Sequence, residues 1–286
     1  SDFVRSEIVA NMEYANPVEE MAVMTRISPV GKAIGGIPDK DAIQTDARNV
    51  HPSYYGNIDP LDTPEGGNIG VIQQLSIDAM ITSARGLFQT RPMTNKEGGG
   101  ILSTSASMIP FVENNEGARI TMATNQSRQM LPLKNPEAPV VQSGYESILT
   151  GVLSDNFIKR SPCDGKILNI TQDSISIQCK RGKVDIDLTP VHLKSGTGKD
   201  TLSIFKTKVI KGQSVKEGQV VAEGSSISEG TIALGRTLCT AYMPYKGYNF
   251  EDGIIISDSL IKNEKLTSLH GIIDEVLVSE NDKILY

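Results

Sequence analysis

Hydrophobic residues recur at helical spacing in two stretches of the first half of the chain. The first stretch, residues 68–83, predicts a helix because its apolar positions follow the period of an α-helix; these positions are Ile69, Ile72, Leu75, Ile77 and Met80. The second stretch, Glu116 to Met130, also predicts a helix, with Asn115 as its cap and Pro132 just beyond its end. The first half is therefore expected to consist of helices joined by loops.

The second half has the pattern of β-strands. From Pro162 onward, short runs of alternating apolar and polar residues are separated by Asp-Gly, Arg-Gly and Glu-Gly turns; the runs read KILNI, SISIQCK, VDIDL, TLSIFKTKVI and QVVAEG. The chain is therefore predicted to be α+β, with a helical and loop region at 1–155 and a β-rich, barrel-like region at 156–286. No long linker separates the two, so they should pack closely.

Just before the first predicted helical stretch, and overlapping its start, lies a segment that is unusually rich in conformationally special residues. Arg48 to Ile72 contains three prolines and four glycines, namely Pro52, Pro60, Pro64, Gly56, Gly66, Gly67 and Gly70. Prolines fix φ, and glycines permit close approaches and left-handed backbone, so this segment is predicted to be a rigid, shaped loop rather than a simple connection.

Composition limits the function classes. With 38% hydrophobic and 22% charged residues the chain is typical of a globular protein. It has no apolar run of about 18 residues and no secretory leader, so a cytoplasmic location is expected. Its cysteines are odd in number and form no C-x-x-C pair, which favours free thiols over disulfides or zinc; they are Cys163, Cys179 and Cys239.

Net charge does not favour nucleic-acid binding by the surface as a whole. The chain carries a formal charge of −6, whereas proteins that bind phosphate backbones usually present an excess of Lys and Arg. Two local clusters of basic residues are compatible with one positively charged channel; these are Arg26, Lys32 and Lys40, and Arg119, Arg128 and Lys134.

Four sequence blocks, in order, resemble one family. HPSYYGNIDPLDTPEGGNIG (residues 51–70) is similar to the HP-xx-YG-xxx-P-x-x-TPEGPNIG signature of the β subunit of multisubunit DNA-dependent RNA polymerases. NMEYANPVEEMAVMTRISPVG (11–31) resembles that subunit's rifamycin-pocket segment, and SMIPFVENNEGARITMATNQSRQMLPL (107–133) resembles a later block. GQVVAEG and ALGRTLCTAYMPYKGYNFEDGIIIS (218–224 and 233–257) resemble a fourth. The resemblance implies a middle portion of this subunit, either a trimmed fragment or a separately encoded piece.

The departures from the family pattern are also informative. Bacterial relatives carry a long insertion where this chain has a short link between Phe88 and Ser105, and the fork-loop-like segment Val30 to Gln44 diverges further. Strong divergence around intact blocks resembles the split polymerases of giant bacteriophages, for which the location would be the host cytoplasm.

The resemblance assigns roles to particular residues. Arg119 matches an arginine that reaches the incoming triphosphate, and Glu251 with Asp252 matches a pair beside the second Mg²⁺ ion, with indirect or transient contact. The apolar run after that pair, Ile254 to Ile256, predicts a buried strand with the two carboxylates at its edge. Nascent RNA or template would contact a polar helix face and one upstream residue, namely Asn125, Arg128, Gln129 and Arg26.

The resemblance also implies a rifamycin-like pocket formed by Glu13, Val23, Arg26, Ser28, Glu65 and Asn68. Val23 replaces a histidine of the family, so rifamycin resistance is expected. The TPEGGNIG loop would be architectural, helping to bring Arg119 and the Glu251–Asp252 pair into one cavity.

The implied partners are the rest of the β subunit, a β′-type subunit with an NADFDGD motif that holds the principal Mg²⁺, and a promoter-specificity subunit, together with DNA template, nascent RNA and nucleotides. The main alternative is a noncatalytic assembly or DNA-clamping subunit with the same fold. GQSVKEGQVVAEG (212–224) also resembles half of a biotinyl or lipoyl carrier, but the modifiable lysine turn is missing. The GTGK in 195–199 lacks the full phosphate-loop frame and is rejected as a nucleotide site.

Overall fold

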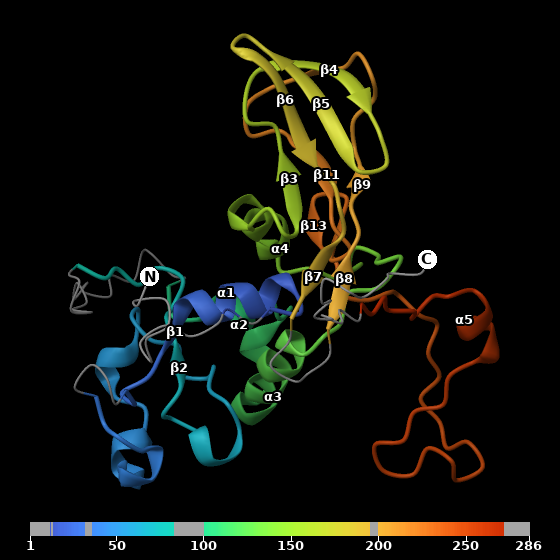
Figure 1. Cartoon of the computed structure of the whole chain (residues 1–286). Helices are drawn as coiled ribbons and strands as arrows, with labels where there is room; N and C mark the ends of the chain where they lie inside the picture. Colours follow the sequence, from blue (N-terminus) through green and yellow to red (C-terminus); the bar gives the residue numbers. More distant parts are fainter. Residues whose placement is uncertain (1–11, 13, 32–35, 83–99, 195–199, 272–286) are drawn as a thin grey trace, which may run out of the picture.

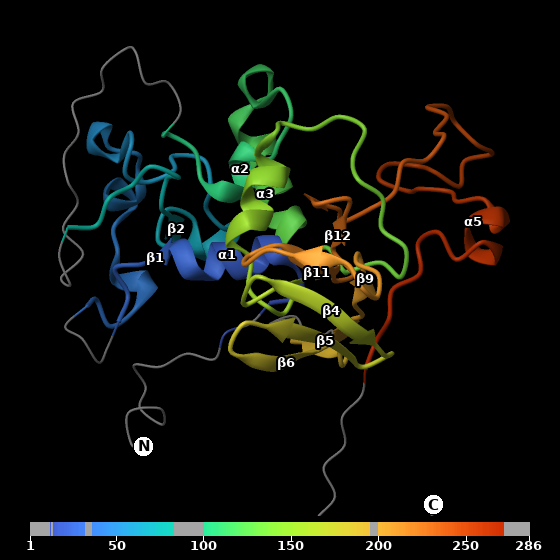
Figure 2. The same cartoon turned by 90° about the horizontal axis from the view of Figure 1, so that it is seen from above.

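The computed structural model describes residues 12, 14–31, 36–82, 100–194 and 200–271. Its helices gather into a base, and an arm of β-strands rises from that base (Figure 1). A third part, the extension that leads to α5 (Asp258–Lys262), projects away from both the base and the arm in two perpendicular views (Figures 1 and 2).

The base contains α1 (Pro17–Thr25), α2 (Thr104–Ser107) and α3 (Gly117–Arg128), with α4 (Tyr145–Leu149) leading into the arm. Short 3₁₀ turns connect them, at η2 (Lys40–Ala42), η3 (Thr45–Arg48), η4 (Pro52–Tyr54), η5 (Gly66–Asn68), η6 (Val112–Asn114) and η7 (Thr150–Val152). Helix α3 confirms the helix predicted between residues 116 and 130.

The predicted cap of α3 is wrong. The N-cap residue is Glu116, whose side chain makes no capping bond, and the Asn115 amide instead donates to the carbonyl of Phe111 at 2.8 Å. Tertiary contacts, described below, hold this helix in place of a cap.

The helix predicted over residues 68–83 does not form. After η5 the chain turns at Gly70, whose φ of +68° belongs to the left-handed region, and then enters β2 (Gln73–Gln74). Strand β2 pairs antiparallel with β1 (Arg26–Ile27), so that Arg26 faces Gln74. The apolar residues do not share one buried face, since Ile69 is 51% exposed whereas Val71 is buried. Helical spacing there was coincidental.

The arm confirms the predicted β-rich half. Its strands are β3 (Ile158–Arg160), β4 (Gly165–Ile170), β5 (Ser174–Cys179), β6 (Gly182–Asp187), β7 (Val191–Leu193), β8 (Thr201–Ser203), β9 (Lys206–Thr207), β10 (Ser214–Val215), β11 (Val220–Glu223), β12 (Ile227–Ser228) and β13 (Thr231–Ile232). They form small antiparallel sheets, the largest in the order β10-β4-β5-β6, beside β3-β11-β9, β12-β13 and β7-β8. The α+β class is confirmed, but the described strands form no closed barrel.

Two hydrophobic cores hold these parts. One lies in the arm, around Ile167, Ile175 and Ile177. The other joins α1 to the start of the arm, because Val18 packs in the same cluster as Phe157. The expected close packing across residue 155 is therefore present, while the domain boundary itself stays a prediction.

The cysteines do not match the expectation of three free thiols. Cys163 and Cys179 are paired as a disulfide with a Cα–Cα distance of 6.1 Å, and Cys239 is free and exposed. The β4–β5 hairpin explains the pair: Gly165 lies opposite Cys179 in the register, so Cys163 is carried close to it. Sequence spacing alone could not reveal this because it depends on strand pairing.

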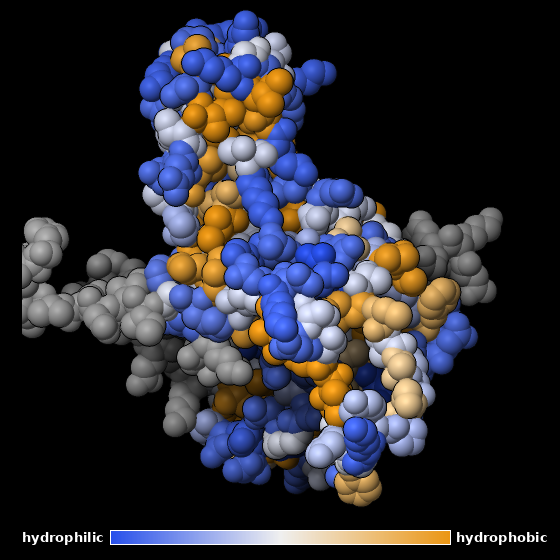
Figure 3. Space-filling model, turned by 90° about the vertical axis from the view of Figure 1, so that its right-hand side faces the viewer, coloured by the Kyte–Doolittle hydropathy of each residue, from blue (hydrophilic) through white to orange (hydrophobic). Residues whose placement is uncertain are grey.

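The buried strand predicted at Ile254 to Ile256 is also absent. No helix or strand lies between β13 and α5, and apolar side chains in this extension face solvent, with Tyr242 98% and Ile254 87% exposed. Figure 3 faces the side from which α5 projects and shows hydrophobic side chains at the surface among hydrophilic ones. The apolar run has no surface of the described chain to pack against. None of the described helices has the length and hydropathy needed to cross a membrane.

Candidate functional site

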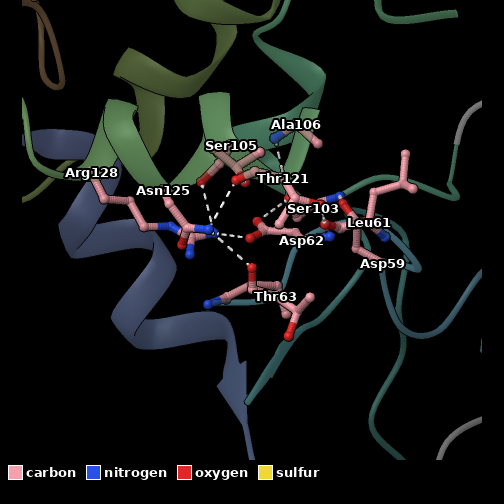
Figure 4. Close-up of polar contacts among 12 residues, drawn as sticks. Asp59, Leu61, Asp62, Thr63, Ser103, Ser105, Ala106, Thr121, Asn125 and Arg128 are labelled. Carbon is pink, nitrogen blue, oxygen red and sulfur yellow. Dashed lines mark hydrogen bonds and ion pairs between the residues drawn. The ribbon is translucent and has the colours of Figure 1, made fainter. Parts of the chain in front are cut away.

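The proline-rich loop lies directly along helix α3, as Figure 4 shows. Three consecutive loop residues each hold one part of the helix. The Leu61 carbonyl accepts a hydrogen bond from the Thr121 hydroxyl at 2.7 Å, and the Thr63 carbonyl accepts one from the Asn125 amide at 3.0 Å. Between them, the Asp62 carboxylate forms an ion pair with Arg128, 66 residues later in the chain. We call this set of three contacts the loop–helix clamp.

Asp62 is the most buried charged group of the clamp. Its side chain is fully buried, and it accepts a hydrogen bond from the Ser103 hydroxyl at 2.6 Å in addition to the contact with Arg128. Burial raises the pKa of the Asp62 carboxyl above its ordinary value, and the Arg128 guanidinium and the Ser103 hydroxyl oppose that rise. Ser103 also caps α2, since its hydroxyl accepts from the Ala106 amide at 3.2 Å. The clamp therefore ties the loop to two helices.

Asp59 gives the loop its shape. One carboxylate oxygen accepts from the backbone amides of Leu61 at 2.7 Å and Asp62 at 3.1 Å, which closes a tight turn. The other oxygen accepts from the Ser103 amide at 2.5 Å. The loop has the defined shape that was predicted, and the two buried aspartates, Asp59 and Asp62, hold that shape.

The clamp changes the interpretation of the predicted nucleic-acid face. Asn125 and Arg128 do lie on one face of α3, as predicted, but that face is turned toward the loop. Gln129 is the C-cap residue and is exposed. Arg119 is also exposed, and within the described chain its guanidinium makes one side-chain hydrogen bond, a donation to the Met122 sulfur at 3.4 Å. Nucleic-acid contact by these residues stays a prediction.

A cavity of about 510 Å³ opens beside the β1–β2 pair. It is lined by three residues of the expected rifamycin-like pocket and by neighbouring ones; the lining comprises Arg26, Ser28, Asn68, Val30, Pro38, Asp39, Lys40, Val71 and Ile72. Among the remaining pocket residues, Val23 is half-buried on α1 and Glu65 is exposed at the start of η5, outside the lining. Glu13 lies outside the described residues.

Glu251 and Asp252 lie on the extension rather than beside α3. Both are exposed, and Glu251 adopts a left-handed φ of +55°. The extension and α3 lie apart in Figures 1 and 2, so the expectation that this pair shares a cavity with Arg119 is not met within the described chain. Across the described ranges, no cluster of three His, Cys, Asp or Glu side chains could hold a metal ion.

Asp59, Asp62 and Ser103 were missed by sequence reasoning. The one signal was that two carboxylates stand three residues apart in a proline-rich stretch, residues 49–72, that contains no Lys or Arg. Their partners lie 41 to 66 residues away, beyond the reach of any local pattern.

Comparison with known proteins finds similarity to RNA polymerase subunits. The model for RNA polymerase Rpb2, domain 3, matches residues 10–81, and the model for RNA polymerase Rpb2, domain 6, matches residues 161–283. The DNA-directed RNA polymerase subunit beta of Desulfatibacillum aliphaticivorans is 28% identical over 98% of this chain. By sequence, the chain is similar to RNA polymerase β subunits.

Other bacterial β subunits are similar to the same degree. That of Myxococcus xanthus is 29% identical over 94% of this chain, and that of Leifsonia xyli subsp. xyli is 28% identical over 98%. The chain spans only 23% to 28% of these β subunits' lengths. The loop–helix clamp joins the matched domain 3 region, through Asp62, to α3, which lies between the two matched regions.

Proposed function

We propose that this chain is part of the β subunit of a DNA-directed RNA polymerase and contributes to template-dependent RNA synthesis. The observation that carries this proposal is the order of the two β-subunit family matches, residues 10–81 and then 161–283, on one chain. The activity belongs to a multisubunit assembly, of which this chain supplies a part.

Arg119 is proposed to bind the triphosphate of the incoming nucleotide. Its exposed guanidinium is not used by any carboxylate of the described chain, unlike that of Arg128. A guanidinium presents several N–H donors in a plane and can therefore bind phosphate oxygens strongly, including charge that develops during phosphoryl transfer. An arginine that forms no ion pair within the described chain, on a helix held by the loop–helix clamp, suits this role.

Glu251 and Asp252 are proposed to act near a second Mg²⁺ ion that arrives with the nucleotide. Carboxylate oxygens are the donors that Mg²⁺ prefers, so the pair fits the chemistry. Two exposed carboxylates provide too few ligands for a resident site, which agrees with an indirect or transient contact. The second ion would neutralise phosphate charge. The principal Mg²⁺ ion would be held by a β′-type partner subunit.

Contacts with the RNA–DNA hybrid are proposed for Arg26 and Gln129, whose side chains are exposed. Asn125 and Arg128 were assigned to the same task, but their polar atoms already bond to the loop. Their contribution to hybrid binding would come through the shape of the α3 surface.

The exposed apolar extension supports a multisubunit assembly. Tyr242, Phe250 and Ile254 expose most of their surface, which would be costly in a free protein and favours a covering partner. The proposed partners are the rest of the β subunit, a β′-type subunit and a promoter-specificity subunit. A split polymerase of the giant-bacteriophage type is proposed from the sequence divergence alone.

The catalytic role is tested by replacing Arg119 in the reconstituted polymerase. Loss of one charge-assisted contact of about 1.5–3 kcal/mol predicts that Arg119→Ala lowers nucleotide incorporation roughly ten- to a hundredfold. Arg181→Ala is the matched control, because Arg181 is also an exposed arginine but lies at the β5–β6 turn of the arm. Equal rates for both variants at limiting nucleotide would exclude Arg119 from the site.

A noncatalytic assembly or DNA-clamping subunit is the second candidate. It is favoured because the extension that carries Glu251 and Asp252 lies apart from α3 (Figures 1 and 2). In that case the Arg119→Ala polymerase would elongate normally, whereas changes in the extension would reduce assembly.

Rifamycin resistance is proposed from the cavity lined by Arg26, Ser28 and Asn68. Val23, which stands where the resemblance has a histidine, offers no side-chain hydrogen bond. The reconstituted enzyme should therefore be insensitive at ordinary drug concentrations, and Val23→His should increase its sensitivity. Strong inhibition of the unmodified enzyme would contradict this.

A further inference from the structure

The loop–helix clamp contacts one side of α3 and does not contact the side that carries Arg119. Successive residues of an α-helix are rotated by roughly 100°, which puts Thr121, Asn125 and Arg128 within an arc of about 60°. Arg119 lies about 120–180° away from these three by the same arithmetic. The side that the loop holds is therefore nearly opposite to the side that carries Arg119.

The clamp fixes the helix in two ways. Contacts at Thr121, Asn125 and Arg128 are spread over two turns of α3, so they oppose both rotation and sliding of the helix. The start of the helix also touches the loop closely, since a methyl group added at Gly117 would lie 3.2 Å from the Leu61 side chain.

Asp62 is the centre of this arrangement. Of the three loop residues in the clamp, Asp62 uses its side chain, whereas the other two use backbone carbonyls. The Asp62 side chain is fully buried and contacts Arg128 and Ser103. The Arg128 side chain is only 13% exposed, and its Nε has no partner in the described structure. Without the carboxylate, a buried guanidinium would lose its counter-charge and Arg128 would move toward solvent, displacing α3.

We propose that Asp62 is a positioning residue for nucleotide addition, which acts through Arg128 to set the rotation and height of α3 and thereby the placement of Arg119 at the nucleotide triphosphate. This rests on the proposed function. Small displacements of a phosphate-binding group are costly, because binding and transition-state stabilisation depend on alignment within about an ångström.

The test is a double-mutant cycle in the reconstituted polymerase, with the KM for nucleotide and the maximal rate of incorporation measured separately. Asp62→Asn keeps the size of the side chain but removes its charge. As the only substitution in the enzyme, it should raise the KM for nucleotide about tenfold. In an Arg119→Ala background the same change should alter the KM by less than about twofold, because the group that it positions is already gone.

A purely structural role would give a different result. An equal effect of Asp62→Asn in both backgrounds would overturn the positioning role while leaving the proposed function standing. Unchanged kinetics for Arg119→Ala alone would instead overturn the proposed function, and the positioning role with it.

Two further variants guard against a failure to fold. Ser103→Ala removes the 2.6 Å bond to Asp62 and the cap bond from the Ala106 amide, but it keeps the Asp62–Arg128 ion pair. It should cause a smaller rise in KM that also disappears in the Arg119→Ala background. Asp62→Glu restores the charge and should recover part of the lost affinity for nucleotide. If Ser103→Ala raises the KM equally with and without Arg119, the positioning role is wrong.

Discussion

Asn16 joins the beginning of α1 to the end of α3, and its replacement by aspartate gives a sharp prediction. The residue is fully buried. Its carbonyl oxygen accepts from two amides at the start of α1, Val18 at 2.9 Å and Glu19 at 3.0 Å. Its side-chain amide donates to three carbonyls at the end of α3, those of Ser127 at 3.0 Å, Arg128 at 2.9 Å and Met130 at 2.7 Å.

Aspartate is as good an N-cap residue as asparagine, so a role limited to capping α1 would make Asn16→Asp nearly neutral. The bonds to α3 predict a large loss instead. A carboxylate has no N–H donor, and it would face carbonyls at the negative end of a helix dipole. Unpaired buried acceptors cost about 1–3 kcal/mol, and the unfavourable charge at this fully buried position adds about 2 kcal/mol, so a total of about 3–5 kcal/mol is expected.

Asn16→Ala loses the cap as well as the donors, but it places no charge against α3. Its expected cost is about 2–4 kcal/mol, from a cap of about 1 kcal/mol and the unpaired carbonyls. Asn16→Asp should therefore be at least as destabilising as Asn16→Ala, the reverse of the order expected for an ordinary N-cap.

Hydrogen exchange of the full chain, with urea unfolding, measures the effect. Protection should fall in both α1 and the last turn of α3. Ser257→Asp is the control, because Ser257 caps the exposed helix α5 by accepting from the Ser259 amide at 3.3 Å and has no second helix to serve. If Asn16→Asp is as stable as the unmodified chain, the coupling between the two helix ends is refuted.

Two further predictions concern the arm. A hydrogen bond from the Ser176 hydroxyl is the main cause of the lowered pKa of the exposed Asp185 carboxyl. Ser176→Ala should therefore return that pKa toward its ordinary value, as measured by NMR titration. An unchanged pKa would contradict the assignment. Because the folded pKa is lowered, this carboxylate favours folding above its ordinary pKa, and that contribution is lost as pH falls through the folded value. The Cys163–Cys179 disulfide closes a loop with a sequence separation of 16, so Cys163→Ser should lower the free energy of unfolding by about 3 kcal/mol. Before reduction, only Cys239 should react with a thiol reagent. Three reactive thiols without reductant would refute the disulfide.

Local sequence patterns were informative where the structure itself is local. Helix α3 could be predicted because its 12 residues form an uninterrupted segment before Pro132, and the arm could be predicted from the alternation within β4 and β5. The segment after Asn68 failed because helical spacing is only an average over positions, whereas one left-handed residue, Gly70, is enough to end a helix.

The contacts that build the candidate site were out of reach for a different reason. Asp62 and Arg128 meet across 66 residues, and Asn16 meets Met130 across 114. A pattern within one segment carries no information about a partner so far along the chain. Only the folded chain reveals that Asn125 and Arg128, on the polar face of α3, bond to the proline-rich loop. The same polar face had suggested RNA contact, which shows that polarity alone does not separate a binding surface from a buried interface.

The two groups proposed for chemistry also differ in how firmly they are held. Arg119 stands on a helix fixed by the loop–helix clamp and by Asn16, whereas Glu251 and Asp252 stand on an extension with no helix or strand of its own before α5. This chain alone can fix the position of Arg119. The Glu251–Asp252 pair needs a partner surface that covers the exposed side chains around Tyr242 and Ile254. On the proposed function, assembly would therefore do more than bring subunits together, because it would set the position of the carboxylate pair relative to Arg119. Substitutions at Tyr242 or Ile254 should then lower nucleotide incorporation without weakening the loop–helix clamp, which hydrogen exchange of α3 can report independently.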